Sequence, residues 1–300
     1  MSTPVSIVFL NFNRIAETRI TVKKLLECKE KDNTIEIIAV DNGSCDGTKE
    51  FLAEIGDNGI KTVLLAENRG IRGYNSGFEI ATGEIIIVLD DDSHIEIDSV
   101  RRVRELFETH TNIGIIAFKI TDSRGIRFNT WHIPSEDVFK DSFAFVGCGF
   151  AIRKDLFSRI GFYPVDFFLY HNEIYVSVQA QLLSYRVVYD PCCVAVHRTS
   201  EAPRNPARRI YYTLKNSLIL IWMYYPMPQA IYLTVSRLII SYSLALVETK
   251  WGAATKALVD FISGRPRKAV LPKEKRKLLK PFFYQNSIIH RILCFRDCFD

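Results

Sequence analysis

The segment Glu84–Asp92 joins a run of apolar residues to three consecutive aspartates. A buried strand cannot continue into adjacent charges, so we predict that the strand ends where the acids begin. Asp90, Asp91 and Asp92 then lie at the carboxyl edge of a sheet, where open α/β folds bind their ligands. Clustered carboxylates call for a cation, and Mg²⁺ or Mn²⁺ is a suitable one. The alternative is a solvated acidic turn before a helix that begins near Asp98.

Length and composition fit a globular protein. Three hundred residues, 48% of them hydrophobic and 24% charged, suffice for one large α/β domain or for one domain with a substantial appendage. Met1–Pro4 run directly into a strand pattern, so we expect no signal sequence. The seven cysteines include no Cys-x-x-Cys pair, which favours reduced thiols in a cytosolic protein over a disulfide framework or a zinc site.

The net charge of +5 is concentrated in one segment. Residues 264–280 hold eight Lys or Arg and one Glu, which makes +7, so the rest of the chain is near −2. Such a segment indicates an anionic partner, either lipid headgroups or nucleic acid, or else it is a solvated linker. The segment contains no aromatic residue to stack on bases, and we therefore expect no nucleic-acid partner.

Short β-branched runs alternate with helical patterns over the first two hundred residues, which predicts a mostly parallel sheet covered by helices. The predicted strands are Val5–Leu10, Ile35–Val40, Thr62–Leu65, Glu84–Leu89, Ile113–Phe118, Ala144–Ile152 and Arg186–Tyr189. Apolar residues at helical spacing predict helices over Asp98–His110 and Glu173–Leu183, and other helices are expected between the strands.

The C-terminal third has a different character. Two apolar stretches, Arg208–Tyr225 and Ala230–Val247, are each about as long as a bilayer core is thick, but prolines such as Pro226 argue against spanning helices. We expect residues 1–200 to form the α/β domain and residues 201–300 a helical extension that lies in or on a cytoplasmic membrane face. The alternative is a soluble helical subdomain packed on the α/β body.

Polar segments follow four of the predicted strands. They are Asn11–Arg14, Asp41–Thr48, Glu67–Asn75 and Asp90–Asp92. Phe12 can stack on a base, Asp41 can accept a hydrogen bond from a pyrimidine N–H, and Arg72 lies in a turn suited to phosphates. Each segment alone has a plain alternative as a loop or a helix cap. Together they place base, phosphate and metal functions on one sheet edge.

An ordered series of motifs resembles the family 2 glycosyltransferases with the GT-A fold. The motifs are Val5–Arg14, Ile38–Ser44, Glu67–Gly70, Leu89–Ser93, Gly147–Phe157, Phe167–Tyr170 and Tyr189–His197. The likeness covers roughly residues 4–200, and the set is specific although each motif alone is not. More weakly, the last hundred residues resemble the membrane-associated extension of rhamnosyltransferase-like members.

The resemblance implies a role for each matching residue. Contacts with a nucleotide-sugar donor are implied for Phe12, Asn13, Asp41, Arg72, Asn75 and Asp90. Asp41 would contact the base and Asp90 the ribose. Asp92 would hold a divalent metal ion, Mn²⁺ or Mg²⁺, with a further contact from His197. Without the motifs, His197 would be a structural histidine.

The implied general base is Glu173. Family members usually show Gly-Glu-Asp-x-Asp after an aromatic run, and this chain has His-Asn-Glu-Ile-Tyr over residues 171–175, with Gln179 where an Arg is common. Only Glu173 keeps a carboxylate, at the position of the usual catalytic Asp and with one extra methylene. Such a side chain can take a proton from a sugar hydroxyl within hydrogen-bond reach. The alternative is that Glu173 only begins its helix, near the positive end of the dipole.

We therefore expect an inverting glycosyltransferase of cell-surface polysaccharide synthesis. It would move a hexosyl or deoxyhexosyl group from a nucleotide-diphosphate sugar to a glycan or lipid-linked acceptor, on the inner face of the cell membrane. One alternative is a nucleotide-sugar-binding protein that has lost catalysis, which the altered Glu173 region suggests. Another is a nucleotidyltransferase, which would need a Gly-rich, Lys-bearing phosphate loop that Asn11–Arg14 does not provide.

Overall fold

A computed structural model describes residues 3–56, 59–198, 205–264 and 267–296. The chain forms two compact units. The first, which we call the α/β unit, comprises residues 1–168 and 172–201. The second, the helical unit, comprises residues 169–171 and 202–300.

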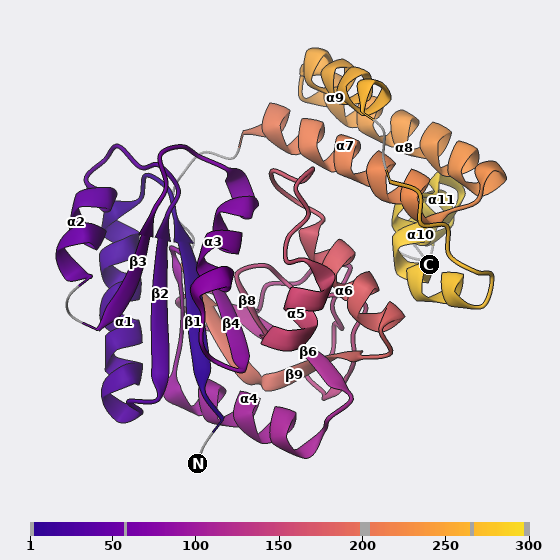
Figure 1. The fold of residues 1–300 in the computed structure, drawn as a ribbon. Coiled ribbons are helices and arrows are strands. Elements are labelled where there is room, and N and C mark those ends of the chain that lie inside the picture. The colour runs from indigo at the N-terminus through magenta and orange to yellow at the C-terminus, as the bar shows by residue number, and fades with distance from the viewer. Residues whose placement is uncertain (1–2, 57–58, 199–204, 265–266, 297–300) are drawn as a thin grey trace. The chain divides into compact units, whose positions relative to one another are not determined.

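The α/β unit is built on one mixed sheet (Figure 1). Its strands are β1 (Val5–Asn11), β2 (Ile35–Asp41), β3 (Ile60–Leu64), β4 (Ile85–Asp90), β5 (Ser93–Ile95), β6 (Ile113–Thr121), β7 (Lys140–Asp141), β8 (Gly149–Arg153) and β9 (Arg186–His197). The strand order is β3-β2-β1-β4-β8-β6-β9-β5, and β7 also pairs with β9. Strands β1 to β4 are mutually parallel, whereas β8 runs antiparallel to both neighbours.

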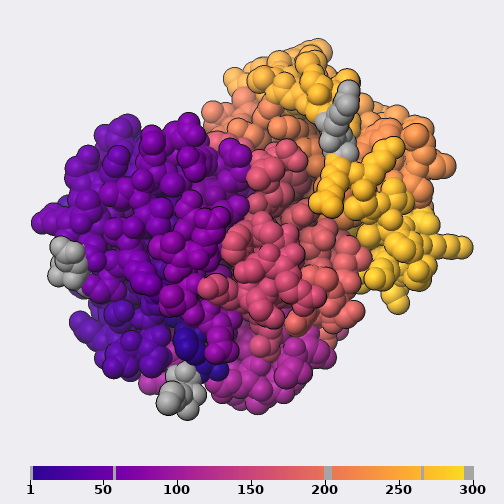
Figure 2. Space-filling model, in the orientation of Figure 1, coloured from indigo at the N-terminus to yellow at the C-terminus, as the bar shows by residue number. Residues whose placement is uncertain are grey.

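Helices cover both faces of this sheet. They are α1 (Ile15–Lys31), α2 (Thr48–Ile55), α3 (Gly73–Ile80), α4 (Ile97–Thr109), α5 (Lys154–Ile160) and α6 (Asn172–Leu182), with a 3₁₀ turn, η1 (Gly70–Arg72). Alternate residues of each central strand enter opposite cores: Ile7 packs with α1, α2 and α4, and Val8 with α3, α5 and α6. Burial on both faces explains why these strands are almost wholly apolar. Figure 2 shows side chains closing the spaces between the ribbons of this unit.

The predicted mostly parallel sheet is confirmed, with two corrections. The strand expected at Ala144–Ile152 begins only at Gly149, because the chain before it forms a loop closed by a bridge between Val146 and Gly149. The strand expected at Arg186–Tyr189 continues to His197, since its second half pairs with β6 and with β5.

The helical unit contains α7 (Pro206–Tyr224), α8 (Met227–Val247), α9 (Trp251–Ser263), η2 (Lys275–Leu279), α10 (Lys280–Asn286) and α11 (Ile288–Arg296). Asn205 caps α7 by accepting a hydrogen bond from the Arg208 backbone, and Pro206 occupies its first turn. Helix α7 packs against α8 and α9, and Leu214 and Leu218 are fully buried between them.

The two apolar stretches of the C-terminal third therefore differ. The first forms α7, which is the core helix of its unit, and a place for this helix in or on a membrane stays a prediction. The second forms α8, which leaves a row of apolar side chains exposed at four-residue spacing: Met227, Ile231, Val235 and Ile239. Within the described ranges, α8 alone has the length and apolar composition to cross a membrane, and core helices of soluble proteins share those properties.

Candidate active site

The strand register brings the polar segments together at one sheet edge. β1 lies between β2 and β4, with Asn11 opposite Asp41 and Leu10 opposite Asp90. The loops that follow these three strands therefore begin side by side, at the carboxyl edge. Asp41 and Asp90 are the last residues of β2 and β4, and Phe12, Asp91 and Asp92 directly follow β1 and β4, so these residues lie at one edge, as the sequence predicts.

Asp91 and Asp92 are buried and Asp90 is half-buried, so the alternative of a solvated turn is wrong. Asp91 is 7% exposed and Asp92 is 2% exposed. Arg14 Nη1 donates to Asp91 Oδ1 at 3.2 Å and to Asp92 Oδ2 at 2.6 Å. The Tyr74 hydroxyl donates to Asp90 Oδ1 at 2.7 Å. The cluster thus contains three carboxylates and one permanent cation.

Burial, mutual repulsion and neighbouring cations shift the pKa values of the three aspartates in different directions. Burial raises the pKa of Asp90, and the charge of Asp92 adds to the effect. Burial also raises the pKa of Asp91 to about 7, although Arg14 opposes the rise. Burial would raise the pKa of Asp92 too, but its contacts with His197 and Arg14 outweigh it and hold the pKa below its usual value. Asp92 is therefore the carboxylate that stays ionised most readily, as a metal ligand must.

His197 reaches the triplet through strand pairing. β5 runs antiparallel to β9 with Ser93 opposite His197, and the Arg198 backbone N–H donates to the Asp92 carbonyl at 2.8 Å. His197 Nε2 lies 3.1 Å from Asp92 Oδ1, and this contact raises the pKa of His197. The two residues predicted to share a metal ion are therefore in direct contact.

Asp41, the last residue of β2, is a buried hydrogen-bond acceptor with one carboxylate oxygen unused among the described residues. Asp41 Oδ2 accepts from the backbone N–H groups of Gly43 and Ser44, at 3.1 and 3.0 Å. Asp41 Oδ1 is buried and has no partner in the described part of the chain. Asn13 ties the loop after β1 to the loop after β2, since its side chain accepts from the Cys45 N–H at 2.8 Å. Phe12, 36% exposed, is available for contact with a ligand.

The loop before α3 depends on a glycine. Gly70 has φ +60°, and a Cβ there would lie 2.1 Å from the Phe168 carbonyl oxygen, which accepts from the Ile71 N–H at 2.9 Å. Arg72 follows in η1, and its guanidinium has no hydrogen bond or ion pair within the described ranges. Asn75 is occupied differently from the prediction: its amide exchanges two hydrogen bonds with the Tyr163 backbone. A donor contact from Asn75 stays a prediction.

Glu173 lies in the first turn of α6, and its carboxylate faces the loop before β8. A Cβ on Gly147 would be 3.0 Å from Glu173 Oε1. The thiol of Cys148, next in the chain, is buried, which raises its pKa, and the charges of Asp90, Asp92 and Glu173 add to the rise. Glu173 and the aspartates therefore lie close to the same small region around Cys148, although more than eighty residues separate them in sequence.

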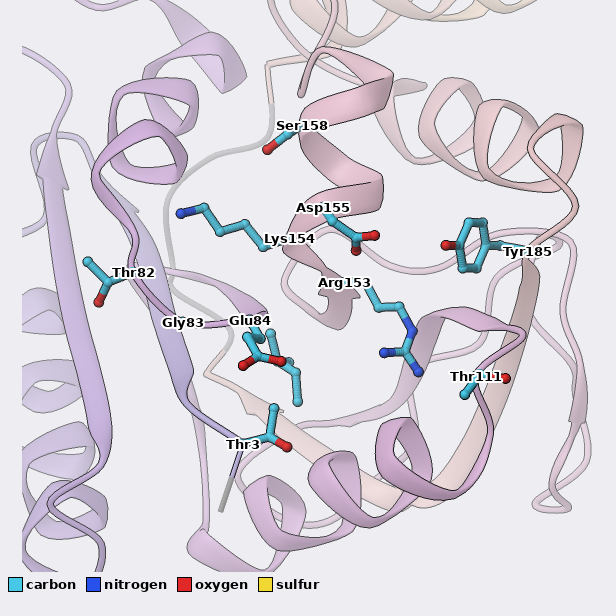
Figure 3. Close-up of a pocket in the computed structure, with 11 residues that line it drawn as sticks. Thr3, Thr82, Gly83, Glu84, Thr111, Arg153, Lys154, Asp155, Ser158 and Tyr185 are labelled. Carbon is cyan, nitrogen blue, oxygen red and sulfur yellow. The ribbon is translucent and has the colours of Figure 1, made fainter. Parts of the chain in front are cut away.

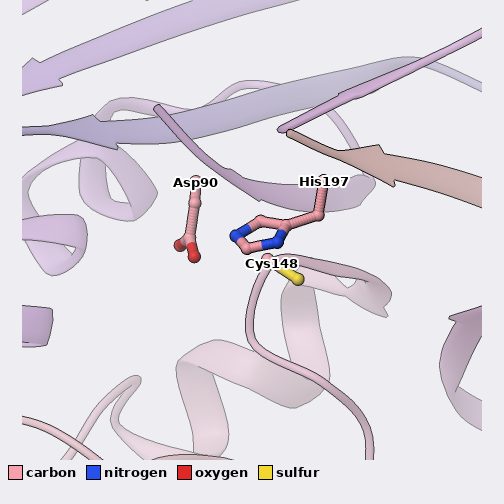
Figure 4. A group of neighbouring side chains, drawn as sticks. All are labelled: Asp90, Cys148 and His197. Carbon is pink, nitrogen blue, oxygen red and sulfur yellow. The ribbon is translucent and has the colours of Figure 1, made fainter. Parts of the chain in front are cut away.

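Three possible metal ligands converge in that region. One ligand atom each from Asp90, Cys148 and His197 lies within 4.8 Å of the other two (Figure 4). Oxygen, nitrogen and sulfur donors of this kind suit a divalent metal ion. Asp92 and His197, which contact each other, are the pair that fits the Mn²⁺ or Mg²⁺ ion that the sequence predicts.

A cavity of about 450 Å³ lies at the opposite edge of the sheet, near the amino ends of β1 and β4 (Figure 3). Its lining includes Arg153, Lys154, Asp155 and Tyr185. Both cations are already bonded to backbone carbonyls: Lys154 to Ala81, and Arg153 to Ile113 and Phe107. This cavity therefore offers a ligand little free positive charge.

Three residues of the site were not predicted. Arg14 was seen only as part of a polar loop, Tyr74 had no role, and Cys148 was part of a motif without a function. The contact of Arg14 with the acids could have been predicted. Arg14 is the only charged residue in the loop after the first strand, and in a parallel sheet this loop lies next to the loop that carries the acids. No sequence signal indicated that Cys148 and Tyr74 belong to the site, because their positions are set by the pairing of β8 and the packing of α3.

Comparison with known proteins identifies relatives of the α/β unit. The family model described as "Glycosyl transferase family 2" matches residues 6–178. An uncharacterized glycosyltransferase of Nostoc, alr2836, is 29% identical over 116 residues, which cover 37% of this chain and 35% of that protein. The succinoglycan biosynthesis protein ExoO of Rhizobium meliloti is 38% identical over 73 residues, 24% of this chain and 21% of that protein. The chain thus matches about a third or less of these two relatives.

Solved structures extend the likeness to most of the chain. The mannosyltransferase PcManGT of Pyrobaculum calidifontis, in complex with GDP-Man and Mn²⁺, superposes with a TM-score of 0.61 at 17% identity, covering 98% of this chain and 83% of that one. At this identity the likeness shows the fold alone. The GT-A fold that the sequence predicts is confirmed.

Proposed function

Since the chain belongs to glycosyl transferase family 2, we propose that it transfers a sugar, with inversion, from a nucleotide-diphosphate sugar to a hydroxyl of a glycan or lipid-linked acceptor. One observation carries the proposal: Glu173, the aspartate triplet and His197 adjoin one region at the carboxyl edge of the sheet. A base, a donor site and a metal site are the three parts that such a reaction needs.

The donor would bind across the loops after β1, β2 and β4. Asp41 Oδ1, buried and unpartnered among the described residues, would accept an N–H of the base, with Phe12 and Asn13 beside it. Asp90 would face the ribose. Arg72, whose guanidinium has no partner within the same ranges, would pair with the diphosphate.

Proton transfer would begin at Glu173. Its carboxylate takes the proton of the acceptor hydroxyl while that oxygen forms a bond to the anomeric carbon. The bond from this carbon to the diphosphate oxygen breaks, and its electron pair leaves with the diphosphate. Arg72 offsets the growing negative charge, and a Mn²⁺ or Mg²⁺ ion held by Asp92 and His197 supplies further positive charge when bound.

The helical unit bears on the choice of acceptor. Its helix α8 exposes Ile231, Val235 and Ile239 in one row, and residues 267–280 are strongly basic. Exposed apolar side chains and clustered cations in one unit suit the surface of an anionic membrane. We therefore place the protein on the inner membrane face, in cell-surface polysaccharide synthesis, with a hexosyl or deoxyhexosyl donor of the kind used by rhamnosyltransferase-like members.

Thermal unfolding with nucleotides tests the proposal most directly. UDP, GDP and dTDP, each with Mn²⁺, are added to the full chain, and at least one should raise the melting temperature because a ligand that binds only the folded state stabilises it. The Asp92→Ala variant should lose the Mn²⁺-dependent part of that rise, whereas Asp98→Asn, an exposed acid nearby, should keep it. Failure of all three nucleotides would contradict the proposal.

The second candidate is a nucleotide-sugar-binding protein without catalysis. The missing acids on either side of Glu173 favour it. Incubation with a panel of nucleotide sugars and acceptors separates the two functions, since only a transferase releases nucleoside diphosphate in step with product.

A further inference from the structure

The proposed sugar transfer gives no role to Cys148, although this side chain lies within the site. It is 7% exposed and belongs to the loop between Val146 and Gly149. Its Sγ, a carboxylate oxygen of Asp90 and a ring nitrogen of His197 all lie within 4.8 Å of one another. The three side chains come from three separate elements and converge on one point (Figure 4).

Strand register fixes Cys148 in this place. Gly149, the first residue of β8, pairs with Leu89 of β4, so the residue before β8 lies beside the residue after Leu89, which is Asp90. The close approach requires small neighbours. A Cβ on Gly149 would be 2.6 Å from Ile120 and 2.7 Å from Ala195. The position of the thiol therefore follows from the sheet rather than from a free loop.

The donor set is unusual for an ion that carries a diphosphate. Mg²⁺ and Mn²⁺ prefer oxygen ligands, whereas thiolate and imidazole favour Zn²⁺ and similar ions. Tetrahedral zinc, with bonds of about 2.0–2.3 Å, holds its ligand atoms roughly 3.3–3.8 Å apart. The present separations of up to 4.8 Å therefore need shifts of only about 1 Å, within the reach of side-chain rotation.

We propose that Asp90, Cys148 and His197 form a site for a thiophilic divalent ion such as Zn²⁺ or Cd²⁺. The ion forms a bond to sulfur, and the thiol proton leaves to solvent. Three protein ligands leave a fourth position for water, as in open zinc sites. Because the proposed function also assigns Asp90 and His197 to the donor and its metal ion, a thiophilic ion here excludes Mn²⁺-supported donor binding and turns the transferase off.

Cadmium is the probe, since a cadmium–thiolate bond gives a charge-transfer absorption in the near ultraviolet. The full chain, reduced and freed of metal with EDTA, is titrated with Cd²⁺ in the absence of nucleotide. We expect the band to saturate at one ion per chain. Cys148→Ser should lose the band and bind Cd²⁺ at least about tenfold more weakly, which is about 1.4 kcal/mol.

Matched variants identify the sulfur. Cys45 and Cys192 are exposed thiols, and their serine variants should keep the full band. His197→Gln should keep the thiolate but weaken Cd²⁺ binding, which tests the site even where Cys148→Ser folds poorly. A band that survives in folded Cys148→Ser, or a Cd²⁺ affinity unchanged in His197→Gln, would overturn the proposal.

Two further outcomes separate this inference from the proposed function. Absence of the band in a chain that still binds nucleotide with Mn²⁺ would refute the thiophilic site and leave the transferase intact. A band at Cys148 in a chain that transfers no sugar would refute the transferase and leave the metal site. Where both hold, increasing Zn²⁺ should displace Mn²⁺-dependent nucleotide binding in the wild type and do so less effectively in Cys148→Ser.

Discussion

The α/β unit buries charge, whereas the helical unit exposes apolar surface. Asp91 and Asp92 are almost fully buried and are held by Arg14. In α8, by contrast, Ile231 is 50% exposed and Val235 52% exposed. Burying charge costs free energy unless partners offset it, and an exposed apolar row favours association. Each unit therefore departs from the usual pattern in the place where we assign it a function: donor chemistry in one, membrane contact in the other.

The largest test of this contrast is Glu173→Gln. Loss of the general base should lower sugar transfer about 10³-fold, while nucleotide affinity stays within about twofold because the amide preserves the shape of the side chain. Initial rates of nucleoside diphosphate release, with calorimetric titration of nucleotide, measure both quantities. Glu54→Gln, an exposed acid on α2, should change neither. Equal transfer by Glu173→Gln and the wild type would remove Glu173 from the reaction.

Two glycine-to-alanine substitutions provide a second test, because the room available for a new Cβ atom differs between a glycine of the α/β unit and one of the helical unit. Gly70→Ala places a Cβ 2.1 Å from the Phe168 oxygen at φ +60°, so the free energy of unfolding should fall by about 3 kcal/mol. Gly252→Ala in α9 meets no atom within 4 Å, and a helical alanine should raise stability by at most about 1 kcal/mol. Urea unfolding measures both variants. Similar values for the two would contradict the close packing of the Gly70 loop.

Most of the α/β unit was predictable because its signals are local. Apolar runs that end in polar loops indicate parallel strands, and parallel strands gather their carboxyl ends at one edge. This reasoning was enough to bring Asp41, Asp90 and Asp92 together. It could not supply the partners of the triplet: Tyr74 comes from α3, and Cys148 is placed by the register of β8 with β4.

The helical unit was harder to predict because hydropathy does not say what covers an apolar helix. The stretches that became α7 and α8 look alike in sequence, yet Leu214 and Leu218 of α7 are fully buried by neighbouring helices. In α8 the row that includes Ile231 and Val235 stays uncovered within the described part of the unit. Only packing separates a core helix from one that is able to meet a membrane.

Membrane contact by α8 is tested by Ile231→Ser combined with Val235→Ser. If both side chains enter the lipid, their loss should weaken binding to anionic vesicles at least about 100-fold, because each buried apolar side chain contributes about 1.5–3 kcal/mol. Co-sedimentation with vesicles of mixed neutral and anionic lipid measures the affinity. Val165→Ser is the matched control, since Val165 is 70% exposed but belongs to the α/β unit. An unchanged affinity in the double variant would refute the assignment of α8.

The smallest expected effect concerns acid stability, and it is tested at Glu36, a largely buried carboxylate of the α/β unit. Burial alone would raise the pKa of Glu36, but hydrogen bonds from Lys61, Ser6 and Thr82 outweigh it and lower the pKa to about 2. A lowered pKa in the folded state stabilises the protein above the unfolded value of 4.5, and that stabilisation is lost as pH falls toward about 2. The same interactions link β2 to β3 and to the turn before β4, so their loss loosens one side of the sheet.

Glu36→Gln should therefore lower the free energy of unfolding at pH 7 by about 1–2 kcal/mol, after allowance for solvent screening, and by less at pH 3. Urea unfolding at the two pH values measures the difference. Asp260→Asn is the control in the helical unit, because this carboxylate, which contacts Tyr211 and Lys256, is 31% exposed against 14% for Glu36, and its loss should matter less. A deficit of Glu36→Gln that is equal at both pH values would mean that Glu36 acts by packing, and burial of charge would no longer distinguish the two units.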